Sequence, residues 1–401
     1  MVFLLGWYTI TRGPKVTHGF AVYYTNARML LEGGDFQKAY DFEYFNMKIR
    51  QSGISGIEDV PHNPPTNSLL LAPLAWMTPE RTKMALSAIS FIAILASFYI
   101  LTRLYRVPLN GAVGMGIGIL FLAWRPLYDN IYLGQIYAIL LLLFCLSMAG
   151  VNRGTPLLAS MPLSFAFLVK GHGGIPMLLF AVRKHWKLLL LVVIWIFLVI
   201  LTTLPFFGID SWVAFYSRIV AHLGTNPTDA GTSYQTINSL VYHLFTYDER
   251  WLPNPLVILP GSLVRIISFL LNLAMIIHVL LAGRASKRSV IPSYSAAIAV
   301  GVVTAPLAEE YAFTLFLPLV VAMVTAVVER FRKTSTLEGF DWVCLTAIIV
   351  MGAPFPYKSL HYEMFPLILL AYPKLCAGVT ILLCFGRMAR AGRFDQMIPR
   401  A

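Results

Sequence analysis

The sequence predicts an all-α polytopic membrane protein, and three observations support this fold class. Only 12% of the 401 residues are charged and 58% are hydrophobic, whereas a soluble domain has about 25% charged residues. The hydrophobic residues form long blocks, such as 187–207 and 255–282, each near the roughly 20 residues with which a helix crosses a bilayer. Basic residues are concentrated in short segments between these blocks, as in the cytoplasmic loops of membrane proteins.

About ten transmembrane helices are expected from the lengths of these blocks. The predicted spans are residues 83–105, 111–126, 131–150, 187–207, 255–282, 292–306, 311–328, 340–353 and 362–385. Residues 1–8 have the composition of the end of a further span, so we expect the natural start to lie upstream. Residues 155–182 are interrupted by Lys170, by three glycines and by a proline. We interpret them as a re-entrant pair, because irregular backbone within a membrane must be surrounded by protein or a cavity.

The topology follows from the basic residues. If the spans alternate, six basic clusters fall on one side, which is then the cytoplasm. These clusters are Arg103 with Arg106; Arg153; Arg183, Lys184 and Lys187; Arg284, Lys287 and Arg288; Arg330, Arg332 and Lys333; and Arg387, Arg390 and Arg393. Most acidic residues lie on the other side, where two long loops, residues 11–81 and 208–254, emerge from a single transmembrane domain of residues 1–401. The first loop is expected to contain interfacial helices: a helix over residues 26–32 that ends at Gly33-Gly34, and a helix over residues 68–76 that lies at the membrane surface. Any chemistry is therefore expected at the non-cytoplasmic face.

Several classes of function lack support in the sequence. The net charge of +12 is explained by topology, so nucleic acid is not an expected partner. The four cysteines lie in hydrophobic segments without metal-ligand spacing, and we expect neither a metal nor a cofactor. There is no Walker loop, dinucleotide-binding fingerprint or nucleophile elbow. The absence of an Asn-x-Ser/Thr sequon is consistent with the plasma (inner) membrane of a prokaryote.

Lys170 is the main candidate for ligand binding, together with the nearby His172. A cation within a membrane usually faces a cavity or a partner, and neighbouring glycines let backbone N–H groups approach an anion. We predict that Lys170 and His172 bind a lipid phosphate; the alternative is a lysine that extends to the membrane surface. Arg265 and Lys374 are predicted as two further buried cations at the phosphate, or as partners of Glu363 or of backbone carbonyls.

Carboxylates of the outside loops are candidates for acid–base chemistry. Glu309 and Glu310 are adjacent in a short hydrophobic turn, and a general base needs one well-placed carboxylate. We predict a catalytic role for both; the alternative is two solvated loop charges. His18 and Asp41, and with them Asp35, are further candidates from the first loop.

A series of short stretches resembles a known family. They are Gly-Phe-Ala-Val-Tyr-Tyr at 19–24 with Leu-Leu-Glu-Gly at 30–33, Tyr-Asp at 40–41, Asn-Pro-Pro at 63–65, residues 70–74, Gly-Gln at 134–135, Lys170, residues 235–240, and residues 306–311 followed by Leu-Pro at 317–318. In order, spacing and topology, nearly the whole chain resembles the integral-membrane glycosyltransferases of family 87. That family includes polyprenol-phosphate-mannose-dependent mannosyltransferases and has the C-type glycosyltransferase fold.

The resemblance implies transfer of a sugar, mannose or another hexose, from a polyprenyl-phosphate carrier to a hydroxyl of a glycolipid or glycan acceptor, without a metal. Basic residues such as Lys170 would hold the leaving phosphate. Four residues that lie in the matching stretches are predicted to bind the substrate, namely Tyr23, Gln135, Asn238 and Tyr311.

The chain departs from the family pattern at two positions. The family's catalytic aspartate would stand at position 19, where this chain has Gly19 preceded by His18. The family also tends to have a histidine where this chain has Glu310. Our hypothesis is that Glu310 is the general base and His18 assists it. The alternatives are an inactive relative that serves polysaccharide assembly and a polar-lipid transporter or flippase, for which buried charges and broken spans are also typical.

Overall fold

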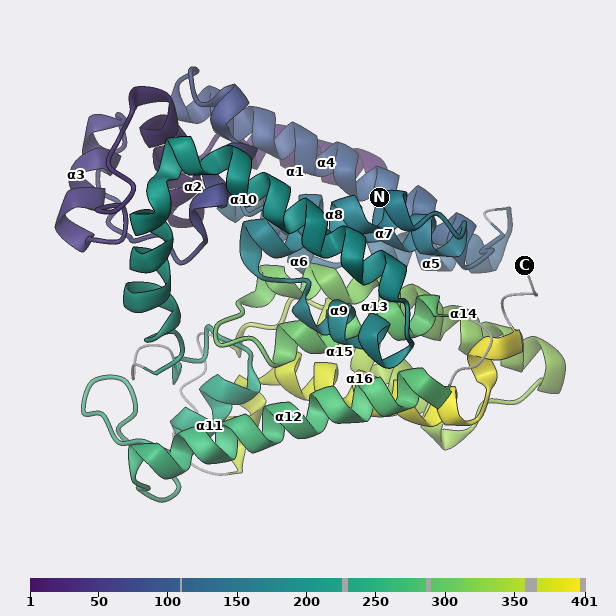
Figure 1. Cartoon of the computed structure of the whole chain (residues 1–401). Helices are drawn as coiled ribbons and strands as arrows, with labels where there is room; N and C mark the ends of the chain where they lie inside the picture. The colour runs from purple at the N-terminus through teal and green to yellow at the C-terminus, as the bar shows by residue number, and fades with distance from the viewer. Residues whose placement is uncertain (109, 226–229, 286–289, 358–365, 397–401) are drawn as a thin grey trace. The chain divides into compact units, whose positions relative to one another are not determined.

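The computed structural model describes residues 1–108, 110–225, 230–285, 290–357 and 366–396. These ranges contain helices and no β-strand, which confirms the all-α prediction (Figure 1). Lys287, Arg288 and Glu363, to which the sequence analysis refers, lie outside them. The chain forms two compact units, the first comprising Met1–Ser97, Leu127–Gly173 and Lys187–His222, and the second comprising Phe98–Pro126, Gly174–Trp186 and Leu223–Ala401. The single transmembrane domain of residues 1–401 stays a prediction.

The first unit contains the N-terminal helices and a helical hairpin. Its elements are α1 (Val2–Arg12), α2 (His18–Glu32), α3 (Phe42–Gln51), the 3₁₀ turns η1 (Pro65–Leu70) and η2 (Ala72–Leu74), most of α4 (Pro79–Leu104) and of α6 (Arg125–Leu133), α7 (Tyr137–Asn152), α8 (Pro156–Lys170), and nearly all of α10 (Trp186–Ala214) with the π-helical turn η3 (Phe215–Val220). Helices α7 and α8 pack against each other along the hairpin. Gly150 allows this contact, since a Cβ there would lie 2.6 Å from the backbone nitrogen of Ala159.

Glycine and proline determine where helices end in the first outside loop. Helix α2 ends as predicted at Gly33, whose N–H donates to the carbonyl of Met29. A surface helix was expected over residues 68–76, but η1 and η2 are found there instead. The reason is that Pro73 has no N–H to donate, so an α-helical hydrogen bond is lost at that point.

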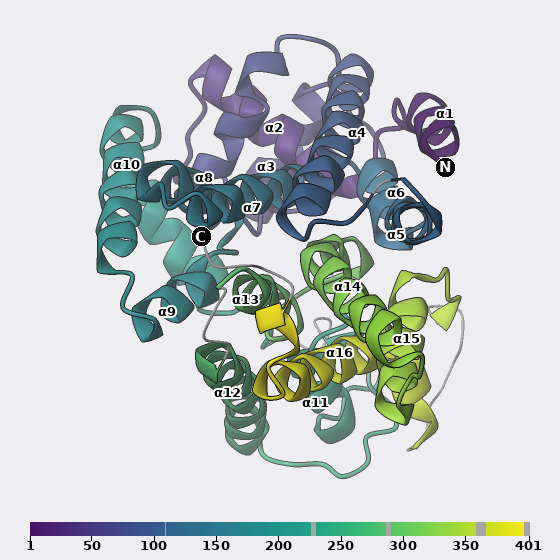
Figure 2. The ribbon, with the colours of Figure 1, turned by 90° about the vertical axis from the view of Figure 1, so that its right-hand side faces the viewer.

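The second unit is built around the C-terminal helices. Its elements are α5 (Ala112–Leu122), α9 (Gly174–Val182), α11 (Ile237–Phe245), α12 (Gly261–Ala285), α13 (Ile291–Val303), the 3₁₀ turn η5 (Glu310–Phe316), α14 (Leu317–Thr334), α15 (Gly339–Gly352), and the 3₁₀ turns η7 (Leu367–Ala371) and η8 (Arg393–Gln396) on either side of α16 (Pro373–Arg390). Helix α16 packs against α12, α13 and α15 (Figure 2).

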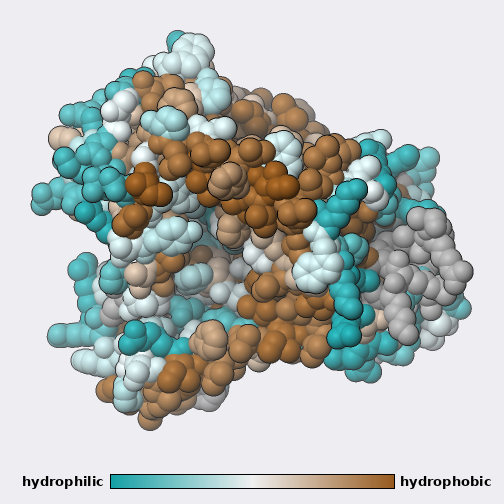
Figure 3. Space-filling model, viewed as in Figure 1, coloured by the Kyte–Doolittle hydropathy of each residue, from teal (hydrophilic) through white to brown (hydrophobic). Residues whose placement is uncertain are grey.

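Among the described residues, four helical segments are long and apolar enough to cross a membrane by length and composition, as expected for a polytopic membrane protein. They are Pro79–Leu104, Trp186–Val220, Gly261–Ala285 and Glu310–Thr334. The shorter apolar helices Tyr137–Asn152, Ile291–Val303 and Gly339–Gly352 coincide with further predicted spans, and Pro156–Lys170 lies in the predicted re-entrant pair. Hydrophobic side chains cover the outer surface of α10 (Figure 3). The interruption predicted in residues 155–182 is present between α8 and α9; its re-entrant path stays a prediction.

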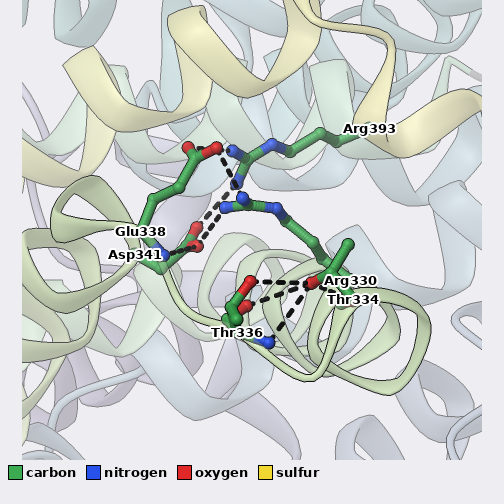
Figure 4. Close-up of polar contacts among 6 residues, drawn as sticks. All are labelled: Arg330, Thr334, Thr336, Glu338, Asp341 and Arg393. Carbon is green, nitrogen blue, oxygen red and sulfur yellow. Dashed lines mark hydrogen bonds and ion pairs between the residues drawn. The ribbon is translucent and has the colours of Figure 1, made fainter.

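A network of charges joins α14, α15 and the C-terminal turn η8 (Figure 4). Asp341 is fully buried, and its carboxylate accepts hydrogen bonds from Arg330 at 2.5 Å and Arg393 at 2.6 Å. The same carboxylate accepts from the backbone N–H of Glu338, and the Glu338 carboxylate pairs with both arginines, at 2.5 and 3.0 Å. Every charge in the network therefore has a partner of opposite sign, as burial requires.

Replacing Asp341 by Asn is expected to lower the free energy of unfolding by about 3 kcal/mol, because two arginines lose a buried counter-charge. The melting temperature of the purified protein in detergent measures this effect. Glu329→Gln is the matched control, since Glu329 forms an exposed pair with Arg332 at 3.0 Å and such pairs contribute little. Equal melting temperatures of the two variants would contradict the prediction.

Candidate functional site

In the first unit, the ammonium group of Lys170 lies among aromatic side chains. Lys170 is the last residue of α8, which ends because Gly171 takes a left-handed conformation with φ of 74°. The half-buried Lys170 donates a hydrogen bond of 2.5 Å to the Tyr23 hydroxyl. Its Nζ lies 5.2 Å from the centre of the Tyr23 ring and 4.9 Å from that of Tyr137, within the range of cation–π attraction.

Three of the other predicted residues join this cluster. The Tyr23 hydroxyl donates to Oε1 of Gln135 at 2.9 Å, so that lysine, tyrosine and glutamine form a chain of hydrogen bonds. The His172 ring nitrogen Nε2 lies 3.1 Å from the Tyr137 hydroxyl. Lys170, His172, Tyr23 and Gln135 are therefore brought together, as a common role in binding requires. Tyr137 was missed by the sequence analysis, although it follows the Gly-Gln stretch by two residues.

The structure gives a physical reason for glycine at position 19. A Cβ on Gly19 would lie 2.0 Å from Nε2 of Gln135 and 3.2 Å from the carbonyl oxygen of Leu133. The space into which a side chain at this position would extend is therefore filled by the Gln135 amide. His18, which precedes Gly19, begins α2 and is exposed.

The two aspartates predicted from the first loop have structural roles in local turns. Asp41 is the N-cap of α3, and its carboxylate accepts from the N–H of Tyr44 at 2.9 Å. Asp35 accepts in the same way from the N–H of Gln37 at 3.0 Å. Both are exposed. These contacts explain both carboxylates as parts of local turns, and the predicted catalytic role of the two residues stays a prediction.

Asp59 is a half-buried carboxylate that the sequence analysis did not single out. Its N–H donates to Oδ1 of the buried Asn46 and its own Oδ1 accepts from the N–H of Val60, each at 2.8 Å. Burial raises the pKa of Asp59, while the bond from Val60 and the charges of His62 and His18 lower it by less. Nothing in the composition of this polar loop distinguishes Asp59 from its neighbours, because its burial results from tertiary packing.

In the second unit, Glu310 is buried at the start of η5 and pairs with Lys374. The Lys374 Nζ lies 3.2 Å from Oε1 of Glu310, without hydrogen-bond geometry, and the Tyr357 hydroxyl donates to Oε2 at 3.5 Å. Lys374 has no exposed surface and donates to the carbonyls of Met351 at 2.8 Å and Ala353 at 2.5 Å. One predicted alternative for Lys374, bonding to backbone carbonyls, is thus observed, and Glu310 is the counter-charge of a buried cation.

The remaining predicted residues of this unit have local partners. The Tyr311 hydroxyl donates to Oε1 of Glu309 at 3.1 Å. Asn238 donates to the carbonyl of Gly224 and accepts from the Ser268 hydroxyl, both at 2.8 Å, so its amide connects α11 to α12.

The prediction that Arg265 is a buried cation is wrong. Its side chain is exposed, and its Nε donates at 3.4 Å to the carbonyl of Gly261 in the first turn of the same helix. The predicted span began at residue 255, whereas α12 begins at Gly261. Arg265 is therefore nearer to the helix end than its position in the hydrophobic block suggested.

No group of three or more His, Cys, Asp and Glu side chains could hold a metal ion in the part of the chain that the structure describes. The Lys170 cluster offers an ammonium group, hydroxyl groups and an imidazole instead, and these groups suit an anionic ligand that also carries hydroxyls.

Comparison with known proteins gives one match. The model of glycosyltransferase family 87 matches residues 62–308, which is more than half of the chain. No curated protein and no solved structure matches, so the C-type architecture stays a prediction. The matched range includes Gln135, Tyr137 and Lys170.

Replacing Gly19 by Ala is expected to destabilise the protein by about 1–3 kcal/mol, because the new methyl group must displace the Gln135 amide. The loss of the bond between Gln135 and Tyr23 should accompany it. Gly116→Ala is the matched control, since nothing lies within 4 Å of a Cβ at this position. Melting temperatures in detergent compare the two; an unchanged value for Gly19→Ala would show that the Gln135 amide does not hold its place.

Proposed function

The chain belongs to glycosyltransferase family 87, and we propose that its donor is a polyprenyl-phosphate sugar and its acceptor a hydroxyl at the non-cytoplasmic face. Membership of the family gives glycosyl transfer as the activity. The donor sugar in our proposal is mannose or another hexose, and the acceptor is a glycolipid or glycan. We propose the plasma membrane of a prokaryote as its location, which the missing Asn-x-Ser/Thr sequons support.

The observation that carries the proposal is that the ammonium group of Lys170 has different partners from those of two other lysines, Lys83 and Lys374. Lys83 is fully buried and donates to the carbonyls of Ile131 at 2.7 Å and Gly13 at 3.1 Å. Lys374 is likewise bonded to carbonyls, so moving either ammonium group towards a ligand would leave buried acceptors unsatisfied. Lys170 contacts a hydroxyl and two ring faces. These contacts are a neutral hydroxyl and two ring faces, so a phosphate would add a full counter-charge beside this ammonium group.

The chemistry of such a site is an in-line displacement. The acceptor oxygen forms a bond to the anomeric carbon, and the bond between that carbon and the phosphate oxygen breaks with inversion. Its electron pair leaves with the phosphate, so negative charge grows there. Lys170 would stabilise this charge, and fixed groups aimed at developing charge contribute most of the rate in many enzymes. The Tyr23 hydroxyl and His172 are additional donors beside it.

The sequence-based hypothesis placed the general base at Glu310, and the contacts of Glu310 favour a structural role for it instead. Its carboxylate is held against Lys374, and removing it would take the negative charge away from that buried cation. The same contacts argue against Lys374 as a phosphate ligand. We therefore assign this pair a structural role in the proposal and place the phosphate at Lys170.

Lys170→Met is expected to weaken binding of farnesyl phosphate and to lower the rate of sugar transfer by about 10²–10³-fold, with an unchanged melting temperature. Lys374→Met is the matched control: it should lower the melting temperature, because Glu310 loses its counter-charge, and leave phosphate binding intact. Binding is measured by thermal shift and calorimetry in detergent, with farnesol as the uncharged ligand. Wild-type affinity in Lys170→Met would contradict the assignment.

The transfer reaction distinguishes this proposal from its alternatives. Wild-type protein is incubated with farnesyl-phosphate mannose, glucose or galactose and an alkyl glycoside acceptor. Formation of the disaccharide supports the proposal. Binding of farnesyl phosphate without transfer of any of the three sugars would instead favour the inactive relative or the flippase.

A further inference from the structure

One acid of the first outside loop differs from all the others. Residues 11–81 are fully described and contain seven Asp and Glu residues. Six of them are exposed, namely Glu32, Asp35, Asp41, Glu43, Glu58 and Glu80, whereas Asp59 is half-buried. Two of the exposed acids cap turns, and Glu32 and Glu58 pair with arginines. The charged groups that act on the Asp59 carboxyl are two imidazoles, those of His62 and His18.

The position of Asp59 is fixed by hydrogen bonds. Its backbone N–H is held by Asn46, and its Oδ1 accepts from the N–H of Val60. Oδ2 accepts no hydrogen bond from the described residues, so this oxygen is available to a hydroxyl group. A carboxylate with one oxygen fixed and the other available has the geometry that a general base needs.

The η1 turn, which begins at Pro65 and follows the loop of Asp59, is attached to the end of α8. Thr66 donates to the carbonyl of Leu168 at 2.6 Å and Asn67 donates to that of Val169 at 3.0 Å, and both bonds are buried. Lys170 is the next residue. The η1 turn that follows the loop of Asp59 is thus held to the last turn of α8, which ends in the proposed phosphate ligand.

We propose that Asp59 is the catalytic residue that takes the proton from the acceptor hydroxyl, with His62 and His18 beside it. This rests on the proposed function. The proton moves from the acceptor hydroxyl to Oδ2 of Asp59, the acceptor oxygen bonds to the anomeric carbon, and the electron pair of the broken bond leaves with the phosphate at Lys170. Glu310 then has no part in proton transfer.

The effect of the Asp59 charge on the stability of the fold supports this role. Because the folded-state pKa of Asp59 is raised, the protonated form is favoured by folding, and this stability is lost as the pH rises through the folded pKa. The charged form of Asp59 is therefore less favourable in the folded protein than in the unfolded chain. Groups placed against their own stability are concentrated at functional sites.

The experiment compares Asp59→Asn, Glu310→Gln and Glu58→Gln in the transfer of mannose from farnesyl-phosphate mannose, or of whichever of the three hexoses the wild type transfers. Asp59→Asn is expected to lower kcat by about 10²–10⁴-fold, with unchanged binding of farnesyl phosphate and an equal or higher melting temperature at pH 7. Asp59→Glu, which keeps a carboxylate, should recover part of the rate. Glu310→Gln should melt at a lower temperature and retain kcat within a few-fold per folded molecule. Glu58→Gln, an exposed neighbour, should equal the wild type.

The outcomes separate the two proposals. Wild-type kcat in Asp59→Asn, or loss of kcat in Glu310→Gln at an unchanged melting temperature, would overturn the role of Asp59 and leave the proposed donor intact. A wild-type protein that transfers none of the three hexoses would overturn the proposed function, and the role of Asp59 with it.

Discussion

The structure depends on how positive charge is compensated where water is absent. An ammonium group in a low-dielectric interior is stable only with partners that replace its hydration. Lys83 and Lys374 have these partners in backbone carbonyls at or beside helix C-termini, where the helix dipole also favours a cation. Lys170 has a hydroxyl and two aromatic faces, which attract a cation more weakly. This difference in compensation, rather than the presence of a lysine, is what distinguishes a candidate binding site from a structural contact.

The same requirement organises the turn around Glu310 in the second unit. Gln235 is fully buried; its N–H donates to the carbonyl of Ala308 at 2.8 Å, and its Oε1 accepts from the N–H of Lys374 at 3.1 Å. The indole of Trp124 donates to the carbonyl of Phe313 within η5 at 3.1 Å. These bonds hold the acidic turn and the start of α16 together, so that the carboxylate of Glu310 meets the ammonium group of Lys374. A carboxylate with this surrounding is a component of the fold.

Much of the architecture could be predicted because it depends on local sequence. The long helices could be predicted from the hydrophobic blocks, the end of α2 from Gly33, and the break before α9 from the glycines after Lys170. The pairing of Lys374 with Glu310 joins residues far apart in sequence, and only tertiary packing brings them together. The half-buried position of Asp59 is inaccessible to sequence reasoning for the same reason, since a polar loop shows no periodicity from which burial can be inferred.

The contacts of Gly19 account for a glycine at this position, where the resemblance to the family leads us to expect an aspartate. Gln135 occupies the space beside Gly19 and holds the Tyr23 hydroxyl, which in turn accepts from Lys170. A carboxylate at position 19 would have to displace this amide and disturb the group that positions the phosphate ligand. Our proposal therefore places the acceptor-activating carboxylate elsewhere in the first unit. Asp59 is the carboxylate that we propose, because it is half-buried and the η1 turn that follows its loop is bonded to the end of α8.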